Sequence, residues 1–97
     1  MSFKRISISD AEQLLRQPST QLADIRDEQS YQLGHIKGAS HLDNHNLQQF
    51  IEDADPDAPL IIYCYHGNSS QSAADWLSEQ GFSDVVSLDG GYEVLRQ

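Results

Sequence analysis

The 97-residue sequence contains a single cysteine, Cys64, so it cannot form an internal disulfide. This excludes a disulfide-stabilised secreted scaffold and favours a reducing compartment, for which we expect the cytoplasm. Long hydrophobic runs are also absent, since the longest, residues 60–64, is far too short to span a bilayer. The N-terminus has a basic pair but no apolar segment after it, so no secretory signal is expected. We therefore expect a soluble protein with no membrane partner.

Basic residues are scarce as well. Six Lys and Arg face 15 Asp and Glu, which gives a net charge of −9. Such a charge disfavours nucleic acid as a partner and opposes the approach of an anionic substrate, unless the local site compensates. The four-residue spacing of His41 and His45 could suit a metal, but we find no complete ligand set around this pair. The sequence therefore predicts no metal and no cofactor.

Short apolar segments alternate with segments of helical pattern along the chain, with no repeat or linker between them. This alternation predicts one α/β domain over residues 1–97, built on a mainly parallel sheet. We expect Ser9 and Glu12 to form a capping box at the first helix, and Trp76 to pack in the core. The expected strands cover residues 3–7, 21–25, 60–64 and 84–88, and residues 36–42 are expected to form a turn that leads into another short strand. The expected helices cover residues 9–16, 28–33, 46–51, 72–80 and 92–96.

Cys64 ends the most apolar predicted strand and is followed by a polar, glycine-containing loop that leads into a helix. Gly67 allows a positive φ and Asn68 tolerates it, so the loop can curve and point its N–H groups at a central anion. The partial positive charge of the helix N-terminus adds to this field. A thiol in such surroundings loses its proton more readily. A reactive thiolate is therefore favoured over a buried, inert cysteine.

Three motifs resemble the rhodanese-like sulfurtransferases, most of all the small single-domain thiosulfate sulfurtransferases. They are Asp24–Asp27 with Tyr31–Ala39, the loop Cys64–Ser69, and Leu88–Glu93. Together they span residues 24–93. The resemblance implies a central, mainly parallel sheet flanked by helices on both faces.

The resemblance also implies the chemistry. Cys64 would take the outer sulfur of thiosulfate, carry it as a persulfide and pass it to a thiophilic acceptor such as cyanide, a dithiol or thioredoxin. In the alternative, Cys64 is a persulfide carrier in a protein relay with no preferred small donor; a non-catalytic interaction module is disfavoured because the cysteine is present. Related phosphatases have an arginine where Ser70 stands here, which argues against phosphate ester hydrolysis.

Residue roles follow from the same motifs. Arg26 is expected to pair with acidic neighbours and so support the architecture rather than touch substrate, and Asp24 is expected to help order the neighbouring loops. The sequence does not decide between solvation and substrate contact for His66, nor whether Tyr65 and Tyr92 form walls of the site. The expected substrate-binding residues are Tyr65, His66, Gly67, Asn68, Ser69 and Ser70, with Cys64 as the catalytic residue.

Overall fold

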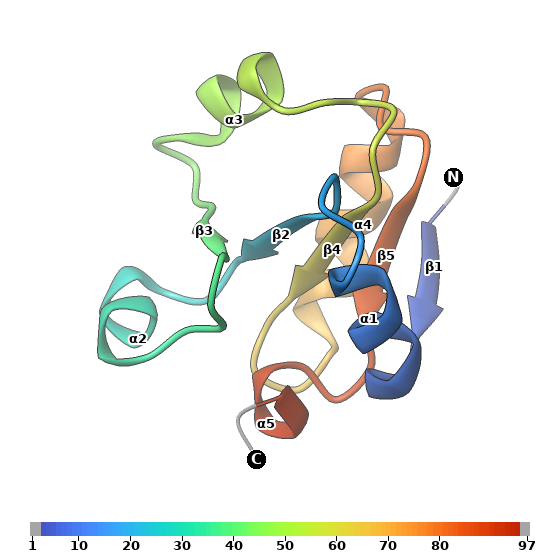
Figure 1. Cartoon of the computed structure of the whole chain (residues 1–97). Helices are drawn as coiled ribbons and strands as arrows, with labels where there is room; N and C mark the ends of the chain where they lie inside the picture. Colours follow the sequence, from blue (N-terminus) through green and yellow to red (C-terminus); the bar gives the residue numbers. More distant parts are fainter. Residues whose placement is uncertain (1–2, 96–97) are drawn as a thin grey trace.

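The computed structural model describes residues 3–95 and contains one five-stranded sheet (Figure 1). All strand pairs are parallel, in the order β1-β5-β4-β2-β3. The sequence-based expectation of a mainly parallel sheet is confirmed. The strands are β1 (Phe3–Ile6), β2 (Gln21–Asp24), β3 (Ser40–His41), β4 (Leu60–Tyr63) and β5 (Val85–Leu88).

Helices cover both faces of this sheet, as expected. Because side chains alternate along a strand, Leu60 and Ile62 of β4 pack on one face with α3 and α4, whereas Ile61 and Tyr63 pack on the other with α1 and α5. In Figure 1, α4 lies behind the sheet and α1 and α5 lie in front. The helices are α1 (Ile8–Leu15), α2 (Glu28–Leu33), α3 (Leu47–Asp53), α4 (Ser69–Glu79) and α5 (Tyr92–Leu95).

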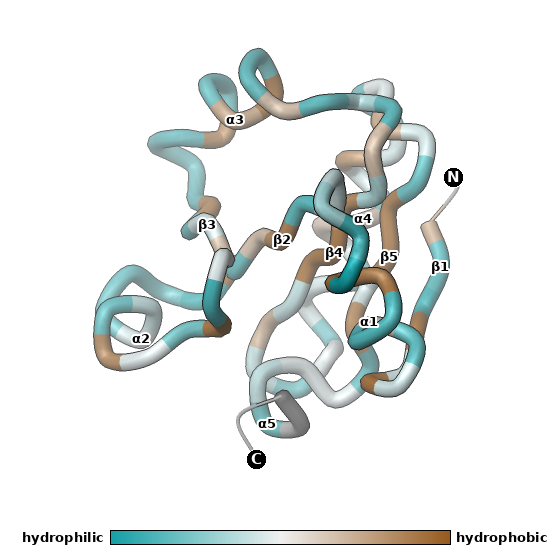
Figure 2. Tube along the Cα trace, in the orientation of Figure 1, coloured by the Kyte–Doolittle hydropathy of each residue, from teal (hydrophilic) through white to brown (hydrophobic). Residues whose placement is uncertain are grey.

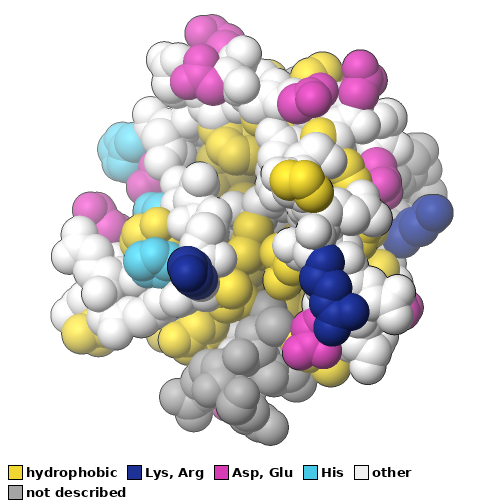
Figure 3. Space-filling model, viewed as in Figure 1, with side chains coloured by type: hydrophobic (Ala, Val, Ile, Leu, Met, Phe, Trp, Pro, Cys, Tyr) yellow, Lys and Arg dark blue, Asp and Glu magenta, His cyan; other side chains and the backbone are white. Residues whose placement is uncertain are grey.

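The two central strands form the most hydrophobic part of the chain (Figure 2). Every residue of β4 and β5 is buried, as expected for strands covered on both faces. Acidic side chains lie around the edge of the face shown in Figure 3 rather than in one patch. Since all strands are parallel, the residues that follow β2 and β4 meet at one edge of the sheet. Cys64 and Arg26 both lie there.

Several local expectations were wrong. Ser7, not Ser9, caps α1, because its side chain accepts a hydrogen bond from the Asp10 N–H at 3.3 Å. Starting the helix at Ile8 places Ala11 in the core, where it is fully buried. Trp76 is 43% exposed rather than part of the core.

Element ends also differ. The helix α4 begins at Ser69, three residues before the expected start, so its first turn lies next to Cys64. Cys64 itself follows β4 rather than ending it. The expected end of the last helix at Arg96 lies outside the described residues. Within residues 3–95, no helix is long and apolar enough to cross a membrane.

Candidate active site

Cys64 lies at the edge of the sheet where β4 ends, with 7% of its surface exposed. The Gly67 N–H donates a hydrogen bond to its Sγ at 3.1 Å, and the Ser70 Oγ lies 3.5 Å from the same sulfur. Gly67 has a φ of 94°, and a Cβ there would stand 2.9 Å from the Gly90 backbone nitrogen. Both the conformation and the space require glycine at this position. The loop therefore holds a backbone donor against the sulfur.

The N-terminus of α4 approaches the same sulfur. Asn68 is the N-cap residue, with a φ of −90°, and it makes no side-chain capping hydrogen bond. The sequence suggested that Gly67 and Asn68 could both adopt a positive φ, but within this loop only Gly67 does so. The N–H groups of the first turn of an α-helix have no partner within the helix and carry partial positive charge. This end of α4 favours a negative charge on Cys64.

The electrostatics of the loop favour the Cys64 thiolate. Burial raises the pKa of this thiol, but the hydrogen bond with the Ser70 side chain acts in the opposite direction. The backbone N–H groups of Ser70, Gly67 and His66 lower the pKa further, so that it lies below its ordinary value. No charged side chain is among these causes. The thiolate is stabilised by dipoles.

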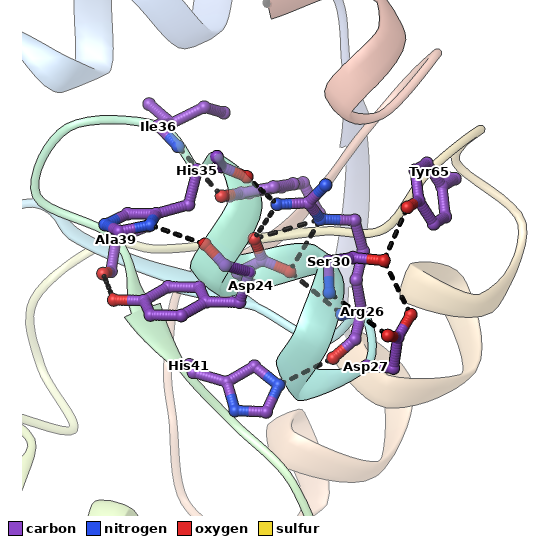
Figure 4. A network of polar contacts seen from close by, with 12 residues as sticks. Asp24, Arg26, Asp27, Ser30, His35, Ile36, Ala39, His41 and Tyr65 are labelled. Atoms are coloured by element: carbon purple, nitrogen blue, oxygen red, sulfur yellow. Dashed lines mark hydrogen bonds and ion pairs between the residues drawn. The ribbon is translucent and has the colours of Figure 1, made fainter.

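Arg26 lies across the pocket in a dense polar network (Figure 4). Its guanidinium pairs with the Asp24 carboxylate, with an Nη2–Oδ2 distance of 2.7 Å and further bonds from Nε. Nη2 also donates to the Gly34 carbonyl at 2.6 Å, and the guanidinium carbon lies 3.9 Å from the centre of the Tyr92 ring. Burial lowers the pKa of Arg26, but the hydrogen bond and charge of Asp24, together with Tyr63 and Tyr65, raise it above its ordinary value. Only 2% of the Arg26 side chain is exposed, so its charge is paired with Asp24 inside the fold and is not available to a ligand.

Hydrogen bonds and ring stacking hold the segment that follows β2 in place. The His41 ring donates from Nε2 to the Arg26 carbonyl at 2.6 Å. His35 stacks on the Tyr31 ring, and its Nδ1 lies 2.9 Å from the Tyr31 carbonyl. Among residues 3–95, no group of three or more His, Cys, Asp or Glu side chains could hold a metal ion. These histidines serve the local architecture.

A pocket of about 200 Å³ opens over the sulfur. The loop brings Tyr65, His66, Asn68 and Ser69 to its wall, while Gly67 and Ser70 contact the sulfur directly. Tyr65 also borders a neighbouring pocket that it shares with Tyr92. The residues that line the pocket with Cys64 are Ile25, Arg26, Asp27, Tyr65, His66, Asn68 and Ser69.

One polar group near the sulfur was missed by sequence reasoning. Ser87 of β5 is fully buried, and its Oγ lies 2.7 Å from the Ser70 Oγ. A serine inside the apolar stretch Val85–Leu88 was the available signal. A buried hydroxyl in a central strand needs a partner.

Comparison with known proteins gives consistent results. A protein of Ectopseudomonas mendocina named "Thiosulfate sulfurtransferase GlpE" is 62% identical over 94 residues, covering 97% of this chain and 85% of that protein. The same name belongs to a Pseudomonas paraeruginosa protein that is 59% identical over 95 residues, covering 98% of this chain and 86% of the relative.

The fold is shared with solved structures. The solution structure of a rhodanese-like domain from Anabaena matches with a TM-score of 0.84 at 22% identity, covering 99% of this chain and 74% of that chain. The model of the rhodanese-like domain family matches residues 7–97. The chain therefore belongs to the rhodanese-like domain family.

Proposed function

We propose that this protein is a thiosulfate sulfurtransferase that carries sulfur as a persulfide on Cys64. The observation that carries the proposal is the arrangement of donors around one buried sulfur: a backbone N–H at 3.1 Å, a hydroxyl at 3.5 Å and a helix N-terminus. The relatives named for this activity support the donor. The proposed domain covers residues 1–97. Its proposed location is a reducing compartment such as the cytoplasm.

The reaction has two steps. In the first, the Cys64 thiolate attacks the outer sulfur of thiosulfate; an S–S bond forms, the old S–S bond breaks, and its electron pair leaves with sulfite. In the second, an acceptor such as cyanide or a dithiol attacks the terminal sulfur of the persulfide. The electron pair of that S–S bond returns to Cys64 as the thiolate. This is covalent catalysis with ping-pong kinetics.

The loop has a role in both steps. The Gly67 N–H and the Ser70 hydroxyl stabilise the thiolate before the first step and receive it again after the second. Tyr65, His66, Asn68 and Ser69 surround the space in which thiosulfate and the terminal sulfur would lie. Arg26, held by Asp24, supports the opposite wall.

The test is the mass of the intact protein after incubation with thiosulfate. We expect the mass of one sulfur atom to be added to the wild type, lost again on addition of cyanide, and absent from Cys64→Ser. Sulfite release by Cys64→Ser at the wild-type rate would disprove the proposal. Circular dichroism checks that this variant is folded.

A protein relay is the second candidate. Among the described residues, the pocket wall offers no exposed Lys or Arg side chain, because its one arginine, Arg26, is 2% exposed, and the protein carries a net charge of −9. Both features oppose binding of the thiosulfate dianion. Sulfur loading by a persulfidated partner protein, with no loading by thiosulfate, would favour the relay. Discharge to thioredoxin tests the proposed protein acceptor.

A further inference from the structure

A second pocket, of about 430 Å³, lies beside the one that holds Cys64. Its floor is apolar and includes Ile25, Leu47 and Leu77, and Trp76 stands at its wall with 43% of its surface exposed. This volume falls in the range of sites that bind small molecules or side chains. An exposed tryptophan is costly to leave in water and is common where proteins bind one another.

This second pocket adjoins the Cys64 pocket. Ile25, Arg26 and Asp27 line both. On α4, Ser69 borders the first pocket, while Ala73 and Trp76 border the second, which is the spacing of one helix face. At 1.5 Å per residue, Trp76 lies roughly 10 Å along the helix from Ser69. That length corresponds to about three residues of extended peptide.

The exposed charges of this groove are negative. Hydrogen bonds from Ser30 hold the pKa of Asp27 below its ordinary value. Burial raises the pKa of Asp43, but the backbone N–H groups of His45 and Asn46, together with the His41 and His45 side chains, lower it below its ordinary value. Both are therefore carboxylates at neutral pH, and Arg26 is neutralised by Asp24. The groove disfavours an anionic occupant, and a net charge of −9 disfavours a second copy of this chain.

We propose that this groove binds the segment beside the reactive cysteine of a partner protein that exchanges sulfur with Cys64. That segment carries an apolar residue two or three positions from the cysteine, which packs on Trp76, and a Lys or Arg that faces Asp27 and Asp43. The inference rests on the proposed function, since it concerns the thiol that meets Cys64.

The test measures discharge of the Cys64 persulfide to two short peptides that each contain a cysteine and a nearby leucine, and that differ in one flanking residue, Lys or Glu. We expect discharge to the Lys peptide to be about fivefold faster at low salt, the size expected for exposed charge pairs. Trp76→Ala lowers discharge to the Lys peptide about tenfold. Discharge to cyanide stays unchanged, because cyanide does not need the groove.

Leu33→Ala is the matched control, because Leu33 is 85% exposed but lies outside the groove. It leaves discharge to both peptides unchanged. Equal discharge to the two peptides, or an unchanged rate in Trp76→Ala, would overturn the inference. The inference would also be overturned if Trp76→Ala slowed discharge only to small aliphatic dithiols and not to the peptides. Failure of the persulfide to form, or to discharge to cyanide, would instead refute the proposed function.

A separate observation concerns the other side of the sulfur. Ser70 and Ser87 are both fully buried, with their hydroxyl oxygens 2.7 Å apart, and the Ser70 Oγ lies 3.5 Å from Cys64 Sγ. Each hydroxyl has one proton to donate. If Ser70 donates to the thiolate, the proton between the two serines must come from Ser87. If Cys64 is a thiol that donates to Ser70, the Ser70 proton is free to point at Ser87, and Ser87 is no longer required as the donor.

We infer that Ser87 is a positioning residue that orients the Ser70 hydroxyl toward the Cys64 thiolate. A donor to Ser70 polarises its O–H and strengthens the bond to sulfur. The charged and titratable groups that face Cys64 across the pocket are Arg26, Asp27, Tyr65 and His66. Asp89, after β5, is paired with Arg5.

The test is the rate of alkylation of Cys64 as a function of pH, which needs no sulfur donor. Relative to the wild type, we expect the midpoint to rise by about half a pH unit in Ser87→Ala and about one unit in Ser70→Ala. Because Ser87 acts through Ser70, the double variant matches Ser70→Ala alone. Ser87→Thr, which keeps the hydroxyl, retains the wild-type midpoint. An unchanged midpoint in Ser87→Ala, or additive shifts in the double variant, would overturn the inference.

Discussion

The loop after β4 and the segment after β2 border the same pocket but treat charge in opposite ways. The loop, residues 64–70, contains no Asp, Glu, Lys or Arg and acts on sulfur through N–H groups and a hydroxyl. The segment after β2 carries full charges, yet Arg26 is enclosed by Asp24, the Gly34 carbonyl and aromatic rings. The anion therefore forms where there are only dipoles.

This difference separates catalysis from architecture. A guanidinium exposed to the pocket would bind a phosphate or sulfate group in a bidentate manner. Here the one arginine at the pocket is 2% exposed, and the loop of residues 64–70 contains none. The sulfur in this pocket is therefore contacted by dipoles and not by an exposed guanidinium. Mutations in the loop should therefore change the rate of sulfur transfer, and mutations in the segment after β2 should change stability.

The largest effect on stability is expected from the charged segment. Asp24→Asn leaves the buried Arg26 guanidinium without its counter-charge, so we expect the free energy of unfolding to fall by about 3–5 kcal/mol. Urea denaturation measures it. The matched control is Asp89→Asn, which breaks the exposed Arg5–Asp89 pair and should cost less than about 1 kcal/mol. Equal losses of unfolding free energy in the two variants would show that the buried Asp24–Arg26 pair matters no more to stability than the exposed pair.

An intermediate effect is expected in the loop, and on rate rather than stability. In Gly67→Ala, the new Cβ meets the Gly90 nitrogen at 2.9 Å, which displaces the N–H donor from Cys64. We expect the rate of sulfur loading to fall about tenfold or more, the cost of one displaced donor.

Gly38→Ala is the control for backbone strain. Gly38 has a φ of 89°, close to that of Gly67, but nothing lies within 4 Å of its Cβ position. It should lose about 1 kcal/mol of stability, the cost of a positive φ, and keep its loading rate. If both variants lost rate equally, strain and not the donor would explain Gly67.

The smallest effect is expected where the two regions touch. The Tyr65 hydroxyl donates to the Ser30 Oγ at 2.6 Å, joining the loop to α2 at the surface. Tyr65→Phe removes this exposed bond and keeps the ring near Arg26, so we expect a loss of stability below about 1 kcal/mol. Discharge to cyanide should change less than about twofold. A larger loss of rate would mean that the two regions are coupled through Tyr65.

The parts of the fold that depend on periodicity were predictable from the sequence. Leu60–Tyr63 has the continuous apolar character of a strand covered on both faces, and alternation with helices predicted the parallel sheet. The three motifs predicted the family, which the comparisons confirm. Such signals are local and strong.

What could not be predicted depends on tertiary contacts. Ser7 and Ser9 are both residue types that can cap a helix, and the sequence does not show that Ser7 is the one that does so. Ser69 and Ser70 resemble loop residues until the contact with Cys64 shows that they begin α4. Trp76 has the spacing of a core residue, but its position on α4 faces an open groove. Ser87 becomes informative only once β5 is placed beside α4.

The central claim is that dipoles alone make Cys64 a thiolate, and the pH titration of its thiolate absorbance tests it most directly. Burial raises the pKa of Cys64, but the Ser70 hydroxyl and the backbone N–H groups of the loop together lower it below its ordinary value. As pH falls, the thiolate should therefore persist below that value and disappear only at a lower midpoint. We expect the rate of sulfur loading to fall over the same pH range as the thiolate absorbance. A midpoint at or above the ordinary cysteine value of about 8.5 would contradict the account.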